Sequence, residues 1–147
     1  AEVLLTKRAS HLKHHPGQIA FPGGKVDPGE SGPVEAALRE AHEEVGLPTD
    51  LVEVMGTLPA HETVTGFSVT PVLGWIGGDF TDIPEAGEVD EVFRVPLSHV
   101  TDHARYSIQS RLWRGQRRSF YAVPWGPYYI WGATARMLRS LADRIRT

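Results

Sequence analysis

The stretch GGKVDPGESGPVEAALREAHEEVGL, residues 23–47, decides how this chain folds and what it does. It holds six of the eighteen acidic residues and only two cations. Glu40, Glu43 and Glu44 follow one another closely, and like charges three and four residues apart on a helix repel by roughly 0.2–0.5 kcal/mol a pair. A divalent metal ion would offset this repulsion, because hard cations prefer carboxylate oxygens.

The same stretch predicts a helix. Gly32 is a candidate N-cap, Pro33 suits the first helical position, and Gly46 marks the end with Pro48 beyond it. Helical spacing places five apolar residues on one core-facing stripe: Val34, Ala37, Leu38, Ala41 and Val45. The three glutamates fall on a separate arc. We therefore expect this helix to pack by one face and to present carboxylates from the other.

Length and composition predict one globular domain over residues 1–147, with 41% hydrophobic residues to form its core. The absence of cysteine excludes a disulfide scaffold and a thiol nucleophile, and it favours a reducing compartment, so we expect a cytoplasmic protein. No apolar run approaches the roughly 20 residues of a membrane span, and the first residues look like a strand rather than a signal peptide. The net charge of −3 does not favour a nucleic-acid partner.

The charges are distributed unevenly. Residues 7–18 and 103–125 are basic and contain no acid, and they flank the acidic stretch in sequence. This pattern favours a polyanionic small-molecule substrate, held by cations while metal ions on the carboxylates neutralise its phosphates. Ordinary solvated surface is the alternative for both segments, and residues 103–125 are also a candidate homodimer interface.

The rest of the chain predicts mainly strands. We expect strands over residues 2–8, 18–23, 51–59, 67–76 and 91–97, a hairpin around Gly115, and a closing helix over about 129–146. Pro71 indicates an edge or bulged strand, since proline cannot donate to a sheet. Residues 77–91 are typical of a polar loop, which overlaps the predicted strand over residues 91–97 at its first residue.

Eight residues of the acidic stretch stand in one ordered array: Gly24, Glu30, Arg39, Glu40, Glu43, Glu44, Gly46 and Leu47. This array resembles the Nudix box of the Nudix hydrolases, G-x5-E-x7-R-E-U-x-E-E-x-G-U, where U is aliphatic. Eight residues rather than seven separate Glu30 from Arg39, and Ala41 is a small choice for the first U position. The extra residue falls where the loop meets the helix, so the register of the glutamates is kept.

The preceding segment, LLTKRASHLKHHPGQIAFPGG at residues 4–24, resembles the upstream signature of the coenzyme A pyrophosphatase branch, L-L-T-x-R-[SA]-x3-R-x3-G-x3-F-P-G-G. The matching positions are Leu4, Leu5, Thr6, Arg8, Ala9, Gly17, Phe21, Pro22, Gly23 and Gly24. Lys13 replaces the second arginine, which keeps the charge but loses the planar fork that binds phosphate bidentately.

The resemblance implies an α+β fold, an α/β/α sandwich with a mixed β-sheet between helices. It also implies Mg2+- or Mn2+-dependent hydrolysis of the diphosphate bond of coenzyme A or an acyl-coenzyme A, giving 3′,5′-ADP and 4′-(acyl)phosphopantetheine. Glu40, Glu43 and Glu44 would hold the metal, with the carbonyl of Gly24 as a further ligand, and Arg39 would brace the glutamates by ion pairing.

The resemblance leaves the water-activating base open. Glu43 is one candidate and Glu88, in the loop before the strand over residues 91–97, is another, with Glu85 and Glu91 as neighbours that could replace it. Substrate contacts are implied at six positions: Arg8, Lys13, Gly17, Phe21, Gly23 and Gly24. For Arg8, pairing with a carboxylate of the box is the competing role.

Two other functions fit the same residues. One is a Nudix diphosphatase acting on ADP-ribose or another nucleotide sugar, which would not distinguish substrates by the 3′-phosphate. The other is a non-catalytic Nudix domain that senses a nucleotide. Three mutually repelling glutamates argue against a pure binder, which has no need of them.

Overall fold

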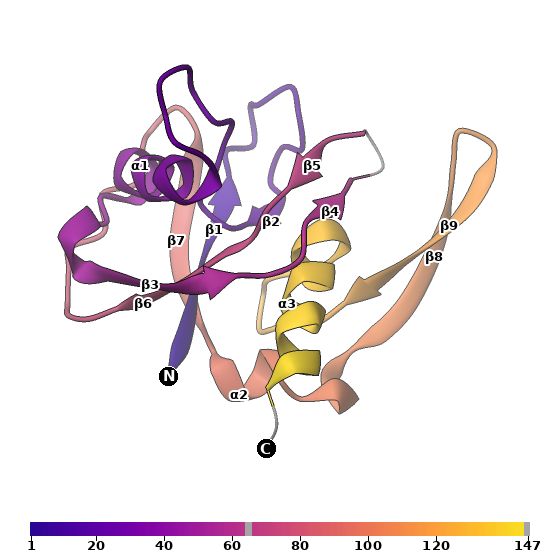
Figure 1. Cartoon of the computed structure of the whole chain (residues 1–147). Helices are drawn as coiled ribbons and strands as arrows, with labels where there is room; N and C mark the ends of the chain where they lie inside the picture. Colours follow the sequence, from indigo (N-terminus) through magenta and orange to yellow (C-terminus); the bar gives the residue numbers. More distant parts are fainter. Residues whose placement is uncertain (64–65, 146–147) are drawn as a thin grey trace.

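The computed structural model describes residues 1–63 and 66–145, and strands dominate it (Figure 1). In chain order the strands and helices are β1 (Glu2–Arg8), β2 (Ile19–Ala20), α1 (Pro33–Val45), β3 (Val52–Thr57), β4 (His61–Glu62), β5 (Ser68–Val69), β6 (Val72–Ile76), β7 (Val89–Pro96), α2 (Leu97–Val100), β8 (Ser107–Trp113), β9 (Gln116–Ala122) and α3 (Gly132–Arg144). Single 3-10 turns lie at Thr49–Leu51 and His103–Arg105. None of the helices described is long and apolar enough to cross a lipid bilayer.

Helix α1 has the predicted bounds. Pro33 occupies its first turn, and Gly46 ends it in the left-handed conformation at φ 77°. The backbone N–H of Gly46 donates to the carbonyl of His42 at 3.0 Å. Glycine is required at this cap because a side chain at positive φ is strained.

Strand β1 lies at the centre of a three-stranded antiparallel sheet in the order β2-β1-β7. It pairs with β7 along its whole length, and the register shifts between Lys7 and Arg8. The other pairs are β3–β6, β4–β5 and β8–β9, also antiparallel. The α+β class is confirmed, but the strands described form separate antiparallel sheets in place of the single mixed sheet that we expected. Part of the reason is Pro71, which lacks an N–H and interrupts the predicted strand between β5 and β6.

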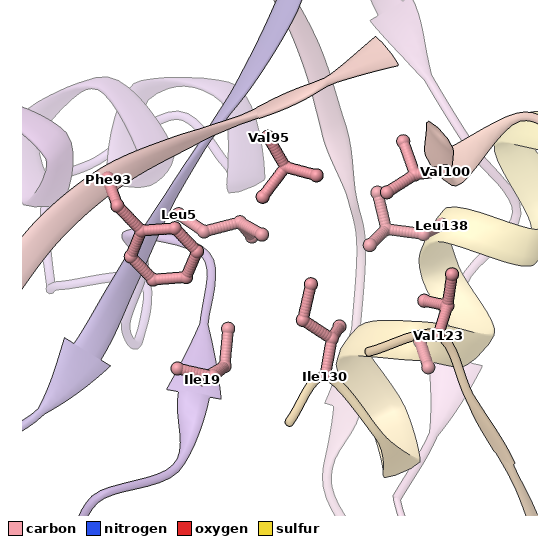
Figure 2. Packing of buried hydrophobic residues seen from close by; sticks show 9 residues of the cluster. Leu5, Ile19, Phe93, Val95, Val100, Val123, Ile130 and Leu138 are labelled. Carbon is pink, nitrogen blue, oxygen red and sulfur yellow. The ribbon is translucent and has the colours of Figure 1, made fainter. Parts of the chain in front are cut away.

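The two faces of the central sheet bury different cores. On one face Leu5, Phe93 and Val95 pack with Leu138 of α3 (Figure 2). On the other face Leu4 and Val92 pack around the core of α1, which contains Ala41, Val45 and the neighbouring Leu47. Successive residues of a strand point to opposite faces, so α1 and α3 cover opposite sides of the sheet. This arrangement is the α/β/α sandwich that we expected.

Several element boundaries differ from the prediction. β2 is shorter than expected, β7 begins at Val89 rather than residue 91, α2 was not expected, and α3 begins at Gly132 rather than near residue 129. The last residue of the expected helix, at position 146, lies outside the described residues.

The face of α1 that carries the glutamates is also partly covered. Ala41 and Val45 of the predicted stripe are buried, but so are Ala36 and Glu44, which lie outside it. The remaining members of the stripe are only half-buried, namely Val34, Ala37 and Leu38. We expected the second face to present all three carboxylates, but Glu44 is covered, and the loop that precedes the helix contributes through the N–H of Gly23.

Candidate functional site

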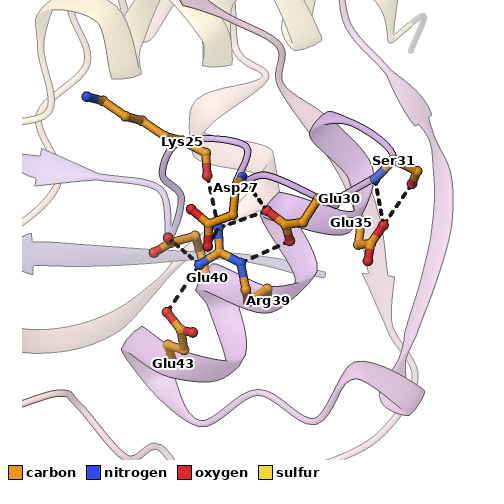
Figure 3. Close-up of polar contacts among 8 residues, drawn as sticks. All are labelled: Lys25, Asp27, Glu30, Ser31, Glu35, Arg39, Glu40 and Glu43. Carbon is orange, nitrogen blue, oxygen red and sulfur yellow. Dashed lines mark hydrogen bonds and ion pairs between the residues drawn. The ribbon is translucent and has the colours of Figure 1, made fainter.

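Arg39 of α1 ties the preceding loop to the helix (Figure 3). Its Nε and Nη2 donate to the two carboxylate oxygens of Glu30, at 2.9 and 3.1 Å. Its Nη2 also donates to the carbonyl of Lys25 at 2.9 Å and lies 3.4 Å from a carboxylate oxygen of Asp27. The extra residue between Glu30 and Arg39 therefore does not prevent their contact, and the loop is held from several sides.

The same guanidinium also contacts two of the three clustered glutamates. Nη1 lies 2.7 Å from Oε1 of Glu40 and 3.3 Å from Oε2 of Glu43. The hydrogen bonds from Arg39 hold the pKa of Glu30 below its usual range, and those to Glu30 and Glu40 raise the pKa of Arg39. Arg39 stays charged, and with Asp27 counted, four carboxylates surround one cation. Negative charge is in excess here.

Glu44 is the most enclosed of the three glutamates. It is 7% exposed, and its Oε2 accepts a hydrogen bond from the backbone N–H of Gly23 at 2.8 Å. Burial, together with the nearby charges of Glu40 and Glu88, raises the pKa of Glu44 to about 7, against the opposing effect of the Gly23 N–H. Glu43 differs, because its side chain is 52% exposed.

Gly24 lies directly against Glu40. A Cβ atom at this position would come within 2.6 Å of the carboxyl carbon and Oε1 of Glu40. At Gly23, by contrast, a Cβ would meet nothing within 4 Å. The two adjacent glycines therefore have different roles. Gly24 leaves room for the carboxylate of Glu40, and Gly23 donates its N–H to the carboxylate of Glu44.

The loop between β6 and β7 packs on the end of α1. The N–H groups of Ile83 and Glu85 donate to the carbonyls of Val45 and Glu44, at 2.8 and 2.9 Å. This packing brings Glu88 near enough to Glu44 to raise its pKa. Glu88 is exposed, and its backbone carbonyl accepts from Ala9 N–H at 2.9 Å.

Glu91 is separated from this group. It lies on β7 two residues before Phe93, on the sheet face that packs toward α3. Its carboxylate is 4.0 Å from Nζ of Lys7 and accepts a hydrogen bond from the Tyr128 hydroxyl at 3.2 Å. The structure therefore brings Glu88, and not Glu91, to the carboxylates of α1.

The donor set suits a hard divalent cation. Oxygen ligands from glutamates, with excess negative charge and a buried carboxylate whose pKa is raised, match the preferences of Mg2+ and Mn2+. Across residues 1–63 and 66–145, however, no three acidic or histidine side chains are arranged closely enough to hold an ion as they stand. Arg39 holds Glu40 and Glu43 in this arrangement, so these two side chains could hold a metal ion only after turning away from it.

Arg8 lies where the register of β1 shifts. Its Nη2 donates to the carbonyl of His14 at 3.2 Å, and its Nε is buried without a hydrogen-bond partner. Within the described part of the chain, Arg8 forms no ion pair with a carboxylate, and its positive charge acts to lower the pKa of Glu44. A buried, unsatisfied donor on a cation is costly unless a ligand or water completes it.

The remaining residues predicted to contact substrate fall into two groups. Lys13 is exposed, and Gly17 turns the loop at φ 68° before β2. Phe21 packs instead against the core beneath α3, so its described contacts are structural.

Sequence reasoning missed two contacts of this site. One is Asp27, which forms an ion pair with Arg39. The only feature of the sequence that could have indicated this contact is the position of Asp27 beside the turn residues Pro28 and Gly29. The other is the N–H of Gly23 on Glu44, which no side-chain pattern reveals because it is a backbone group.

Known proteins resemble this chain in sequence and in fold. The family model described as NUDIX domain matches residues 1–114. The protein "Uncharacterized Nudix hydrolase NudL" of Enterobacter sp. (strain 638) is 46% identical over 143 residues, which cover 97% of this chain and 74% of the relative.

Solved structures share the fold. The Nudix hydrolase RenU of M. smegmatis superposes with a TM-score of 0.56 at 30% identity, over 67% of this chain and 62% of that one. The Nudix domain of Shewanella oneidensis NrtR, solved with ADP-ribose, gives a TM-score of 0.51 at 21% identity, over 67% of this chain and 64% of that one. The second likeness concerns the fold alone.

Proposed function

The chain belongs to the Nudix hydrolase family, and from that premise we propose that it hydrolyses the diphosphate bond of coenzyme A or an acyl-coenzyme A. The products would be 3′,5′-ADP and 4′-(acyl)phosphopantetheine. The observation that carries this choice of substrate is Arg8, a cation of the segment upstream of the box whose buried Nε lacks a partner. A substrate with a diphosphate and a 3′-phosphate would supply acceptors for it.

Nudix hydrolases generally use divalent metal ions. In our proposal Glu40, Glu43 and Glu44, with the carbonyl of Gly24, would hold Mg2+ or Mn2+. A metal bound there would neutralise phosphate charge and lower the pKa of a bound water. Arg39 would act as a positioning residue, because it joins the loop at Glu30 and Lys25 to α1, while Glu40 and Glu43 would turn from it toward the metal.

The proton acceptor in our proposal is Glu43 or Glu88. Glu43 is more open to solvent than Glu40, with 52% of its side chain exposed against 17%, so water can reach it. Glu88 is exposed too, and its charge acts on Glu44. Arg8 and Lys13, both in the basic segment over residues 7–18, would bind the substrate phosphates; Gly17, Gly23 and Gly24 let the backbone approach.

The first test is product analysis by liquid chromatography. Coenzyme A, ADP-ribose and NADH are incubated separately with the protein and Mg2+ or Mn2+, and again with chelator. We expect metal-dependent 3′,5′-ADP and phosphopantetheine from coenzyme A, well ahead of the other two substrates. Faster cleavage of ADP-ribose would support the nucleotide-sugar alternative, and binding without cleavage would support a sensor.

Arg8→Ala separates substrate contact from a structural role. If Arg8 binds the 3′-phosphate, the variant should lose most of the preference for coenzyme A over 3′-dephospho-coenzyme A, on the order of tenfold or more in kcat/KM. Lys25→Ala, whose backbone carbonyl rather than its ammonium binds Arg39, serves as the control and should keep the preference. An equal loss on both substrates would assign Arg8 to structure.

The proposal also takes residues 1–147 as one domain in the cytoplasm, acting on small molecules rather than on nucleic acid or membranes. We also propose that the protein forms a homodimer.

A further inference from the structure

The turn end of the hairpin β8–β9 projects from the rest of the fold (Figure 1), while Tyr121 and Ala122 at its base pack into the fold. Within the residues described, β8 pairs only with β9, and β9 forms one further isolated bridge, between Ala122 and Trp131. Their turn consists of Arg114 and Gly115, at φ 50° and 76°, and two positive φ values are the mark of a tight hairpin turn. A two-stranded hairpin is marginally stable in water on its own.

The turn decides which backbone groups of β8 point outward. In a hairpin with a two-residue turn, the flanking residues Trp113 and Gln116 exchange both hydrogen bonds, and bonded pairs then alternate along the strands. Ile108, Ser110 and Leu112 consequently turn their N–H and C=O groups toward the free edge of β8. No backbone hydrogen bond from another described element reaches these groups.

The same residues expose apolar side chains. Ile108 is 70% exposed and Leu112 is 67% exposed, and both lie on one face with Ser110 between them. The only charged residue of the strand is Arg111, on the opposite face, and the strand contains neither proline nor lysine. The devices that normally protect an edge strand from pairing are therefore missing.

We propose that β8 pairs antiparallel with β8 of a second copy of this chain, across a two-fold axis through Ser110. In this register Ile108 lies opposite Leu112 of the second copy, Gln109 lies opposite Arg111, and Ser110 lies opposite its own equivalent. Apolar residues meet apolar residues, and no arginine faces an arginine directly. The result is a four-stranded sheet in which the backbone N–H and C=O groups of the two β8 edges form hydrogen bonds with each other.

A second copy is the favoured occupant because the strand is complementary to itself. A two-fold interface must place the same surface on both subunits, and IQSRL satisfies this condition about its central serine. The arginines near the edge form cation–π contacts within their own chain. The guanidinium carbon of Arg111 lies 4.4 Å from the ring centre of Trp131, and that of Arg118 lies 5.2 Å from the ring centre of Trp113. This inference does not depend on the substrate.

One charge opposes the pairing. The Arg117 Nη1 donates to the Ser110 hydroxyl at 3.2 Å, so the two copies of Arg117 approach the axis. Their repulsion should weaken with ionic strength. The dimer should therefore tighten as salt rises.

The test is sedimentation velocity over a concentration series, with two proline variants. Ser110→Pro removes an N–H from the outer edge of β8 and keeps the hydrogen bonds to β9, because Ser110 and Ser119 form a non-bonded pair. Ser119→Pro removes the N–H on the opposite edge and is the matched control. We expect a dimer in the parent protein and in Ser119→Pro, and a monomer in Ser110→Pro.

A cross-linking experiment makes the conclusion independent of how the proline variants fold. The chain has no cysteine, so Ser110→Cys introduces a single thiol at the axis, where Cα atoms of a bonded pair lie about 5.5 Å apart, within disulfide range. Mild oxidation should cross-link Ser110→Cys into dimers and leave Ser119→Cys largely uncross-linked. A monomer at all concentrations, or a dimer unchanged in Ser110→Pro, or equal cross-linking of both cysteine variants, would overturn the proposal.

Discussion

Arg39 and the two glycines of the loop show how single residues shape the candidate site. Arg39 contacts carboxylates on both the loop and the helix, and Gly23 and Gly24 admit two glutamates to the same region. Each role rests on a different property: the planar fork of a guanidinium, a backbone donor, and the absence of a Cβ. Substitutions at this scale can therefore separate geometry from charge.

Gly24→Ala should lower kcat about tenfold or more with little loss of stability. The added Cβ would come within 2.6 Å of the Glu40 carboxyl group, and a flexible carboxylate can move aside cheaply but then loses its position. Gly23→Ala is the matched control for kcat, since its Cβ meets no atom within 4 Å; hindered approach of the substrate to the backbone there would change KM instead. Steady-state kinetics and thermal melts of both variants measure the difference; equal kcat values would remove the role assigned to Gly24.

Glu43→Gln should lower turnover about a hundredfold or more, because the amide can neither accept a proton nor bind a metal as a carboxylate does. Glu85→Gln should change turnover little, since the hydrogen bond described between Glu85 and α1 comes from its backbone N–H. Single-turnover rates of the two variants give the comparison. Mild and equal effects would withdraw Glu43 from the proposed chemistry, and a large effect of Glu88→Gln alone would transfer the role of base to that residue.

At the scale of elements, the end of α1 and the loop between β6 and β7 form one unit. The loop donates backbone hydrogen bonds to the last residues of the helix, and Gly46 leaves room for Ile83. The loop carries Glu85 and Glu88. Packing at the helix end therefore decides where these carboxylates lie.

Gly46→Ala should destabilise the fold by about 2 kcal/mol or more, because it combines strain at positive φ with overpacking. A Cβ there would lie 2.9 Å from the Cβ of Ile83. Gly115→Ala isolates the strain, since Gly115 has almost the same φ of 76° and nothing within 4 Å. Its cost should be about 1 kcal/mol. Urea unfolding measures both, and equal costs would show that the contact with Ile83 is unimportant.

For the whole molecule, pH should act on stability through a pair outside the site. Arg94 of β7 donates to both oxygens of Asp82, at 2.7 and 2.8 Å, and these bonds hold the pKa of Asp82 below its usual range. A depressed pKa in the folded state contributes stability above the unfolded pKa, about 3.9 for Asp. That contribution disappears as the pH falls through the folded value.

Asp82→Asn should therefore lower the free energy of unfolding by about 1 kcal/mol near neutral pH. The difference from the parent protein should shrink toward zero as the pH falls below about 4. Asp79→Asn is the control, because Asp79 is exposed and forms no ion pair within the described part of the chain. Thermal melts from pH 7 downward test this, and a difference that grows in acid would contradict it.

The parts of the molecule that the sequence predicted well depend on local chemistry. Pro33 and Gly46 set the bounds of α1, and Gly115 places the hairpin turn. The parts that it did not predict depend on segments that meet only in the fold. Glu44 is buried because the loop at residues 21–27 folds over its helix, and the separate sheets follow from pairings that alternation of residue types does not specify.

Neighbouring residues of β1 serve different cores: Leu4 faces α1 and Leu5 faces α3. A slip of this strand by one residue would exchange the two environments, so both cores select the same register. Both cores also pack on the one strand pair β1–β7, so loss of that pairing would expose both of them. The two halves of the sandwich should thus open to hydrogen exchange as one cooperative unit, with the slowest amides along β1 and β7.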